Sequence, residues 1–231
     1  MGGVPNGRWP QTSLVGRLGP DDRAVVLGLG GRVRHRAGEA LIREGEDSDF
    51  VLILLGGMVK VSARAQDGRE ALLAVRIAGD LIGEFAGIDG RPRSARITAC
   101  GSLLAQRVGR APFLACLQAN PGIAIAVNEV VVAKMRAATG RIVDFAGCDV
   151  LTRLARMLRY LVLTYPRPGG PPAVINPPLS QAELATLVGA SDSAVGKSLR
   201  TLREREIIST RYRTVTIRDL TALEQIASER A

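Results

Sequence analysis

Four groups with complementary chemistry lie close together in the first half of the chain: a backbone turn, a carboxylate, a guanidinium and a hydroxyl. Gly83-Glu84-Phe85 is followed, ten residues after Gly83, by Arg93-Ser94-Ala95. An ionised glutamate only accepts hydrogen bonds, which suits the hydroxyl groups of a sugar. An arginine supplies the charge-assisted hydrogen bonds that phosphates accept. This spacing therefore predicts a site for a sugar that carries a phosphate.

A second set of polar residues, later in the chain, indicates the start of a helix pair. Ser180-Gln181-Ala182-Glu183 has the pattern of a capping box, in which the side chains of Ser180 and Glu183 satisfy free amides at a helix start. Gly189-Ala190 then supplies a tight turn. We expect a short helix between the box and the turn.

The helix that follows this turn has an apolar side and a polar side. Ser191 is placed to cap it, and Val195, Leu199 and Leu202 recur at the spacing of one buried face. The opposite face carries Ser193, Lys197, Arg200 and Arg203. A short helix, a glycine turn and a second helix with a polar face predict a helix-turn-helix, whose second helix fits the major groove of DNA. An ordinary basic helical bundle is the alternative.

The segment after this helix pair predicts a hairpin. Ile207–Thr210 and Thr214–Ile217 are β-like and flank Arg211-Tyr212-Arg213, so two arginines would meet a phosphate backbone. The chain carries a formal net charge of +9, mostly from arginine, which favours a polyanionic partner. We therefore expect double-stranded DNA.

The phosphate-sugar residues lie in a region of short strands broken by glycines, from Gly30 to Val108. Strand-like segments with intervening turns such as Asp67-Gly68 favour a small antiparallel roll or barrel. The clearest of these segments are Phe50–Leu55, Val59–Ala63, Ala71–Ile77 and Ser94–Ala99.

A long helix is predicted from Asn120-Pro121 to Phe145, after a short one over Phe113–Gln118. Apolar residues seven apart would form a seam on it: Ala124, Val131, Ala138 and Phe145, with Met135 and Ile142 at the complementary positions. Such a seam suits pairing with the same helix of a second copy. Packing of the seam against its own roll is the alternative.

The helical pattern is interrupted at Gly147-Cys148-Asp149, where we place the domain boundary. Asp149 can cap a next helix over Val150–Leu163. Tyr165–Pro172 reads as a loop, and Pro177-Pro178 marks a further break.

Cysteine and histidine usage argues against metal sites and catalysis. Cys100, Cys116 and Cys148 are widely spaced, and His35 is the single histidine, so zinc, iron–sulfur and Ser/Cys–His chemistry are not expected. Because a Ser/Cys–His pair is not expected, we do not expect an enzyme. Neither a secretory leader nor a membrane span is evident, so we expect a cytoplasmic protein.

Taken together, these motifs resemble the cAMP receptor protein/FNR family of bacterial transcription regulators, from about residue 13 to 227. The resemblance implies an α+β fold: an N-terminal double-stranded β-helix (a cyclic-nucleotide-binding jelly roll), a long dimerisation helix and a C-terminal winged helix-turn-helix. It implies a tail over 1–11, a nucleotide-binding domain over 12–120, a dimerisation helix over 121–147 and a DNA-binding domain over 148–231.

The family pattern assigns roles to the phosphate-sugar residues. Glu84 would hold the ribose 2′-hydroxyl, and Arg93 would neutralise the cyclic phosphate with help from the Ser94 hydroxyl and the Ala95 amide. Amides at the turn of Gly83, Glu84 and Phe85 would face the anion. Apolar pocket positions match Val61 and Leu73, and Thr139 on the long helix would touch the purine.

Several positions depart from the family pattern. The loop between Glu84 and Arg93 is one residue shorter, Ala138 stands where a second hydroxyl is usual, and Ala74 replaces a serine. Cyclic AMP is the effector that the resemblance implies, while cGMP, cyclic di-GMP or no ligand stay open. The alternative to a nucleotide site is a salt bridge between Glu84 and Arg93 in a roll that binds no ligand. The alternative to a transcription regulator is a sensory module that acts on an enzyme or partner protein.

The helix-turn-helix also departs from the pattern at its base-reading positions, which are Asp192, Ser193 and Lys197 here. Lys197 can contact a guanine edge, and Asp192 either accepts from cytosine or serves as a helix-start charge. The resemblance implies a homodimer that binds an operator and contacts RNA polymerase. We expect the DNA contacts from Ser180, Ser191, Asp192, Ser193, Lys197, Arg200, Arg211 and Arg213.

Overall fold

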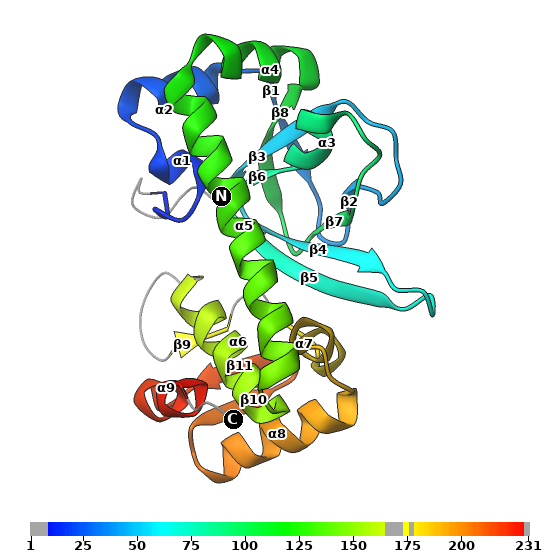
Figure 1. Cartoon of the computed structure of the whole chain (residues 1–231), viewed down its shortest axis with the longest axis vertical. Helices are drawn as coiled ribbons and strands as arrows, with labels where there is room; N and C mark the ends of the chain where they lie inside the picture. The colour runs from blue at the N-terminus through cyan, green and yellow to red at the C-terminus, as the bar shows by residue number, and fades with distance from the viewer. Residues whose placement is uncertain (1–8, 165–172, 176–177, 229–231) are drawn as a thin grey trace. The chain divides into compact units, whose positions relative to one another are not determined.

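A computed structural model of the chain describes residues 9–164, 173–175 and 178–228 (Figure 1). It divides into two compact units, Met1–Met135 and Arg136–Ala231, which meet inside one long helix. Most of the expected tail over 1–11, the loop Tyr165–Pro172 and Pro177 lie outside the described residues. The division into 12–120, 121–147 and 148–231 stays a prediction.

The first unit contains two four-stranded antiparallel sheets, which confirms the expected jelly roll. One sheet has the strand order β1-β8-β3-β6 and the other has the order β2-β7-β4-β5. The strands are β1 (Gly31–His35), β2 (Ala40–Ile42), β3 (Phe50–Gly56), β4 (Met58–Arg64), β5 (Glu70–Ile77), β6 (Leu81–Ile82), β7 (Arg96–Ala99) and β8 (Leu103–Gly109).

Strand β3 is buried on both faces, and its two faces belong to two different cores. Leu52 and Leu54 pack between the sheets with residues of β2, β4, β7 and β8. Val51 and Ile53 face the other way, into a core shared with helices. A strand covered on both faces reads as a continuous apolar run instead of an alternating one, as Phe50–Leu55 does.

Helices cover the outer face of the β1-β8-β3-β6 sheet. Leu14, Val26, Phe113 and Val127 represent the four helices that contribute buried side chains to this core. The helices of this unit are α1 (Leu14–Arg17), α2 (Pro20–Gly28), α3 (Glu84–Asp89), α4 (Arg110–Ala119) and the first part of α5 (Pro121–Gly147). No single helix in the described ranges has the length and apolar composition to cross a membrane; α4 and α5 pass that test only together, bent by 115°.

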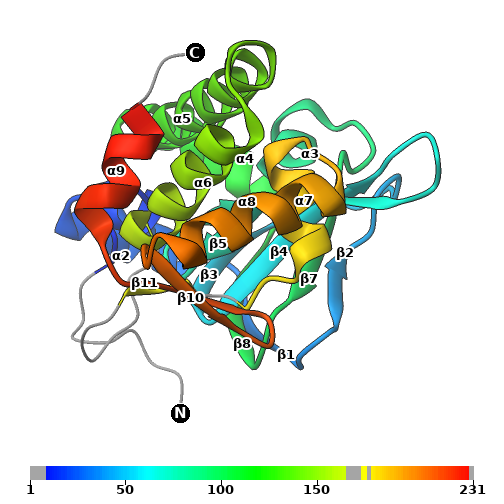
Figure 2. The same ribbon diagram turned by 90° about the horizontal axis from the view of Figure 1, so that it is seen from below.

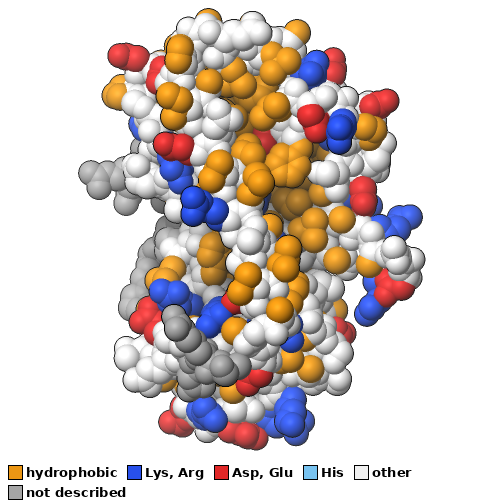
Figure 3. Space-filling model, in the orientation of Figure 1, with side chains coloured by type: hydrophobic (Ala, Val, Ile, Leu, Met, Phe, Trp, Pro, Cys, Tyr) orange, Lys and Arg blue, Asp and Glu red, His pale blue; other side chains and the backbone are white. Residues whose placement is uncertain are grey.

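The exposed apolar residues of α5 form a stripe that differs from the expected seam. Met135 and Ile142 are 60% and 66% exposed, as a seam requires. The positions that complete the heptad, however, are Ile125, Val132 and Thr139, all exposed, whereas Ala124, Val131 and Ala138 are half-buried. Exposure in the single chain therefore favours a stripe one residue further along at these positions, and pairing through Ala124, Val131 and Ala138 stays a prediction. Hydrophobic side chains lie along α5 on the face shown in Figure 3.

Among its described residues, the second unit has four further helices and a small antiparallel sheet of order β10-β11-β9. Helices α7 and α8 contact each other, and α8 contacts β10 (Figure 2). The elements of this unit that follow α5 are α6 (Val150–Thr164), β9 (Ala173–Val174), α7 (Gln181–Val188), α8 (Asp192–Glu204), β10 (Ile208–Arg211), β11 (Thr214–Ile217) and α9 (Leu220–Ser228). A helix pair followed by a hairpin confirms the winged helix-turn-helix.

Candidate functional site

Gly83 makes the turn between β6 and α3, and its lack of a side chain is required there. Its φ is 75°, in the left-handed region that side chains disfavour. A Cβ at this position would lie 2.7 Å from Nη1 of Arg93 and 2.9 Å from Cδ1 of Ile42. The glycine thus lets the guanidinium of Arg93 approach the turn that begins α3.

The Arg93 side chain points into the roll, and the residue is 3% exposed. Its Nη1 donates to the carbonyl of Gly83 at 2.8 Å, and its Nη2 donates to the carbonyl of Phe50 at 2.5 Å. Its Nε donates to Oγ of Ser48 at 2.7 Å. Each of these acceptors is neutral, so the contacts orient the guanidinium without neutralising its charge.

Among the residues that the structure describes, no carboxylate forms an ion pair with Arg93. Burial lowers the pKa of the guanidinium, while the charges of Glu46, Asp49 and Glu84 act in the opposite direction without forming an ion pair with it. The ring of Phe50 has the guanidinium carbons of Arg93 and Arg107 within 4.7 and 4.1 Å of its centroid. A buried cation with only neutral hydrogen-bond partners favours an anion nearby.

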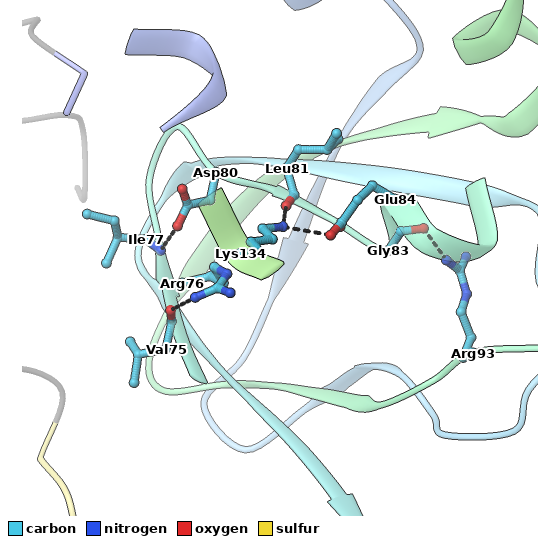
Figure 4. A network of polar contacts seen from close by, with 9 residues as sticks. All are labelled: Val75, Arg76, Ile77, Asp80, Leu81, Gly83, Glu84, Arg93 and Lys134. Carbon is cyan, nitrogen blue, oxygen red and sulfur yellow. Dashed lines mark hydrogen bonds and ion pairs between the residues drawn. The ribbon is translucent and has the colours of Figure 1, made fainter. Parts of the chain in front are cut away.

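Glu84 forms a buried ion pair with Lys134 of α5 (Figure 4). Nζ of Lys134 lies 2.8 Å from Oε1 of Glu84, and it also donates to the carbonyl of Leu81 at 2.7 Å. The side chains are 15% and 7% exposed, respectively. Burial lowers the pKa of Lys134, and the carboxylate of Glu84 opposes this shift. The expected alternative of a Glu84–Arg93 salt bridge is wrong, because each residue has other partners.

A second carboxylate lies near this ion pair. Asp80 accepts a hydrogen bond from the amide of Ile77 at 2.9 Å, and burial raises the pKa of its carboxyl group. Arg76 and Lys134 favour its ionised form, whereas Glu84 disfavours it. Figure 4 shows these residues around the end of Lys134, where β5, β6 and α5 meet. Charges on α5 are thus linked to charges beside the Gly83 turn.

The other residues expected to bind a nucleotide differ in exposure. Ser94 is exposed and Ala95 is half-buried, and both directly follow the buried Arg93 in the chain. Val61 is half-buried, while Leu73 and Phe85 are 38% and 46% exposed. These apolar side chains leave surface for a ligand to cover.

Thr139 is exposed on α5 and belongs to the second unit. It lies on the apolar stripe defined by Ile125, Val132, Met135, Thr139 and Ile142. Its contact with a purine stays a prediction.

The helix-turn-helix has the local geometry that its capping residues predict. The Ser180 side chain accepts from the amide of Glu183, and Glu183 accepts from the amide of Ser180, which completes the capping box. Gly189 has a φ of 60° at the turn, and Oγ of Ser191 accepts from the amide of Ala194 to cap α8. These contacts fix where α8 begins.

Helix α8 buries one face and leaves the other in water. Val195, Leu199 and Leu202 are 0%, 5% and 0% exposed. The exposed residues include all the expected contact positions of this helix, Asp192, Ser193, Lys197 and Arg200. A cationic, solvent-facing helix surface of this kind is free to enter a groove.

The two arginines of the hairpin are arranged differently from each other. Arg211 is exposed, whereas Nη2 of Arg213 lies 3.3 Å from Oε2 of Glu183 in the capping box. Arg213 therefore ties the hairpin to the start of α7, and its contact with a phosphate stays a prediction.

Two residues beside the candidate site at Gly83, Glu84 and Arg93 were not expected from the sequence: Lys134 and Ser48. Lys134 did carry a signal, because it interrupts the apolar run Val130–Met135 and is one of only three lysines in the chain. A charged residue inside an apolar stretch is costly to bury unless a group of opposite charge pairs with it. Ser48, in a polar loop before β3, carried no such signal.

Family models match both units. A cyclic nucleotide-binding domain matches residues 32–120, and a Crp-like helix-turn-helix domain matches residues 152–226. A CRP-like cAMP-activated global transcriptional regulator of Mycobacterium tuberculosis is 30% identical over 182 residues, which are 79% of this chain and 81% of that protein. The similarity therefore extends across the roll and the helix-turn-helix.

Solved structures share the fold at lower identity. FixK2 of Bradyrhizobium japonicum matches with a TM-score of 0.75 and 18% identity, over 88% of this chain and 100% of that chain. The c-di-GMP responsive global regulator CLP of Xanthomonas campestris matches with a TM-score of 0.72 and 21% identity, over 86% and 99%. With a nucleotide-binding roll and a DNA-reading helix pair in one polypeptide, the chain belongs to the cAMP receptor protein/FNR family, whose members are transcription regulators and not enzymes.

Proposed function

We propose that this chain is a homodimeric transcription regulator whose affinity for its DNA operator is controlled by a cyclic nucleotide, cAMP first among them. The observation that carries this proposal is the guanidinium of Arg93, buried and held by three neutral acceptors without a paired carboxylate. A cyclic phosphate carries a negative charge that could pair directly with this guanidinium, as none of the nearby carboxylates does in the described residues. The relative from Mycobacterium tuberculosis, a cAMP-activated regulator by name, supports cAMP as the first ligand to test.

Lys134 offers a route from the nucleotide to α5. A ribose hydroxyl that donates to Glu84 would share the carboxylate with Lys134, whose ammonium now lies 2.8 Å away. The strength of the Lys134 contact would then depend on whether ligand is bound. A ligand shifts a conformational equilibrium only by binding one arrangement better than another, and this shared carboxylate supplies such a difference.

The apolar stripe of α5 supports the homodimer. From Val132 to Ile142 its residues recur at alternating spacings of three and four, as the a and d positions of a coiled coil do, and Ile125 lies one heptad before Val132. Ile125, Val132, Met135 and Ile142 are 47–66% exposed in the single chain. Pairing with a second copy of the helix would remove this apolar surface from water.

The exposed side of α8 supports DNA binding. Lys197 and Arg200 project from it, and Arg211 is exposed on the adjoining hairpin. Lys197 is the residue that we expect to contact a base, and the arginines are expected to contact phosphates. A regulator that binds the operators of a bacterial cell works in the cytoplasm and acts on RNA polymerase, which completes the proposal.

Calorimetric titration with cAMP, cGMP and cyclic di-GMP tests the nucleotide. We expect saturable binding of cAMP that Arg93→Gln weakens about 10- to 150-fold, the value of a charge-assisted contact. Arg32→Gln, which removes an exposed arginine of β1, is the matched control and should bind as the wild type does. Arg93→Gln leaves buried carbonyls unpaired and could therefore disturb the fold. Ser94→Ala is a second variant that spares the fold, and it should weaken cAMP binding about 3- to 10-fold.

Two alternatives remain distinguishable by the same titration. A regulator with a degenerate pocket would give no heat with any of the three nucleotides, and its DNA affinity would not respond to them. Cyclic di-GMP is the second candidate effector, favoured by the shared fold with the c-di-GMP responsive regulator CLP. Selective heat with cyclic di-GMP would replace cAMP in the proposal and leave the DNA-binding role unchanged.

Light scattering of the purified chain tests the homodimer. We expect a dimer that Met135→Glu converts to monomer, because a charge would enter the seam between paired helices. Ala137→Glu is the matched control, since Ala137 is exposed on the same helix but lies off the stripe. A wild-type monomer, or equal dissociation by both variants, would contradict pairing through this stripe.

A further inference from the structure

The tip of the hairpin formed by β10 and β11 has an unusual turn. Only Tyr212 and Arg213 separate the two strands, and Arg213 has a φ of 52°. A left-handed backbone at a residue other than glycine costs about 1–2 kcal/mol. Two-residue hairpin turns commonly contain a positive φ, which lets the chain reverse directly and places the two turn residues at the end of the hairpin.

Tyr212 is 90% exposed, the most exposed of the large hydrophobic residues that the structure describes. Within the described ranges its ring makes no hydrogen bond or ring contact, and only its backbone carbonyl is used, as the acceptor for Oγ1 of Thr214 at 3.2 Å. A single exposed apolar residue is common on protein surfaces. This one, however, stands at the end of a strained turn, beside the helix that faces DNA.

One of the two arginines beside Tyr212 is engaged by a carboxylate of α7. Arg213 is directed back to Glu183, with Nη2 and Oε2 3.3 Å apart, and this contact holds the hairpin against α7. Arg211 precedes the turn at the end of β10 and is exposed. The outermost group of the hairpin is therefore an aromatic ring with a hydroxyl, and not a cation.

The hairpin is fixed beside α8. Nη1 of Arg203 on α8 donates to Oγ1 of Thr210 on β10 at 3.2 Å, and the two elements are in contact (Figure 2). In B-DNA each major groove is bordered by phosphates and then by a minor groove. An element held beside a helix in the major groove therefore meets first the phosphates and then the minor groove.

We propose that Tyr212 packs against the deoxyribose and base edges of the minor groove that flanks the major groove entered by α8. This inference rests on the DNA-binding function proposed above. The phenol can donate to the adenine N3 and thymine O2 acceptors, whereas the guanine amino group obstructs the ring. Tyr212 thus contributes packing and an A·T preference at the flanks of the operator, and Arg211 contributes charge.

The experiment uses a duplex that the full-length wild-type protein selects from a random-sequence library in the presence of each of cAMP, cGMP and cyclic di-GMP in turn and without nucleotide. Affinity is then measured over a series of salt concentrations under the condition that gave the selection. We expect Tyr212→Ala to weaken binding about tenfold, the size of one lost base-pair contact, at every salt concentration. The slope of log K against log salt should not change, because no phosphate contact is lost. Arg211→Ala should instead lower that slope by about one.

Replacing the flanking A·T pairs of the duplex by G·C should weaken the wild type and leave Tyr212→Ala unaffected. Tyr212→Phe, which keeps the ring and removes the hydroxyl, should lie between the two proteins. The melting temperature of Tyr212→Ala should equal that of the wild type, since the ring is 90% exposed and supports no core.

Unchanged affinity of Tyr212→Ala, or a salt slope lowered as much as by Arg211→Ala, would overturn the inference while leaving the proposed function in place. Failure of the wild type to select any duplex would overturn the proposed DNA-binding function itself, and this inference with it.

Discussion

The charged groups beside the Gly83 turn are buried, whereas the charged groups on α8 and the hairpin face water. Glu84 and Arg93 are 5% and 3% exposed, and both have several fixed hydrogen-bond partners or an ion pair. Lys197, Arg200 and Arg211 are exposed on the helix-turn-helix unit. The two regions carry the same residue types in opposite environments.

This difference separates two uses of charge. A buried charge is costly unless its partners are in place, so changes around it alter the stability of the fold. An exposed charge contributes little to stability, but it attracts a polyanion over a distance set by salt. We therefore expect the roll to respond to substitution in its unfolding free energy, and the helix-turn-helix unit in the salt dependence of DNA binding.

The largest effect is expected at the Lys134–Glu84 ion pair. Lys134→Met should lower the unfolding free energy by about 3–5 kcal/mol, because Glu84 is left buried without its cation. Lys134→Met/Glu84→Gln should recover most of this loss, since no unpaired charge remains. Arg17→Met is the control: it breaks the exposed Arg17–Glu129 pair, and about 1 kcal/mol or less should be lost. Equal losses of unfolding free energy at the two ion pairs would contradict the contrast between buried and exposed charges.

A smaller effect, and one that depends on pH, is expected at Asp80. Burial raises the pKa of its carboxyl group in the folded chain, so the folded state holds this proton more tightly than the unfolded state does. The stability from this group is present below the ordinary aspartate pKa and is lost as the pH rises through the raised value. Asp80→Asn should therefore gain stability relative to the wild type from acidic to neutral pH. Denaturant unfolding at several pH values measures the unfolding free energy of both proteins. A difference between Asp80→Asn and the wild type that stays constant with pH would contradict this prediction.

The smallest effect on stability is expected at Arg200. Arg200→Gln should change the unfolding free energy by no more than about 0.5 kcal/mol, because the side chain is exposed. The same variant should lower the slope of log K against log salt by about one in DNA titrations, as the loss of one phosphate contact does. A large loss of unfolding free energy, with an unchanged slope of log K against log salt, would show that Arg200 stabilises the fold and does not contact a phosphate.

Local signals made much of the fold predictable. The capping box of Ser180 and Glu183, the turn at Gly189 and the cap at Ser191 were all identified from residue types a few positions apart. Asp149 likewise accepts from the amide of Thr152 at 2.7 Å at the start of α6, as expected. Contacts between neighbours in sequence depend on backbone geometry that short patterns specify.

Long-range contacts were not predictable in the same way. Lys134 lies 50 residues from Glu84, and the carbonyl of Phe50 that Arg93 contacts lies 43 residues before it. The seam of α5 was predicted at Ala124, Val131 and Ala138, which are half-buried, because apolar periodicity does not tell a stripe that faces the core from one that faces outward. Burial by the rest of the unit decides between them.

The amino-acid sequence by itself determined several central strands of the roll, the long helix, the helix pair with its hairpin, the helix caps and the presence of a phosphate-suited arginine beside a glycine turn. Only the tertiary structure decided that this arginine is turned inward onto neutral carbonyls and that Glu84 pairs with a lysine of α5. The physical reason is that periodicity and capping act over a single turn of backbone, whereas the partner of a buried charge is chosen by which distant segment folding brings within hydrogen-bonding distance.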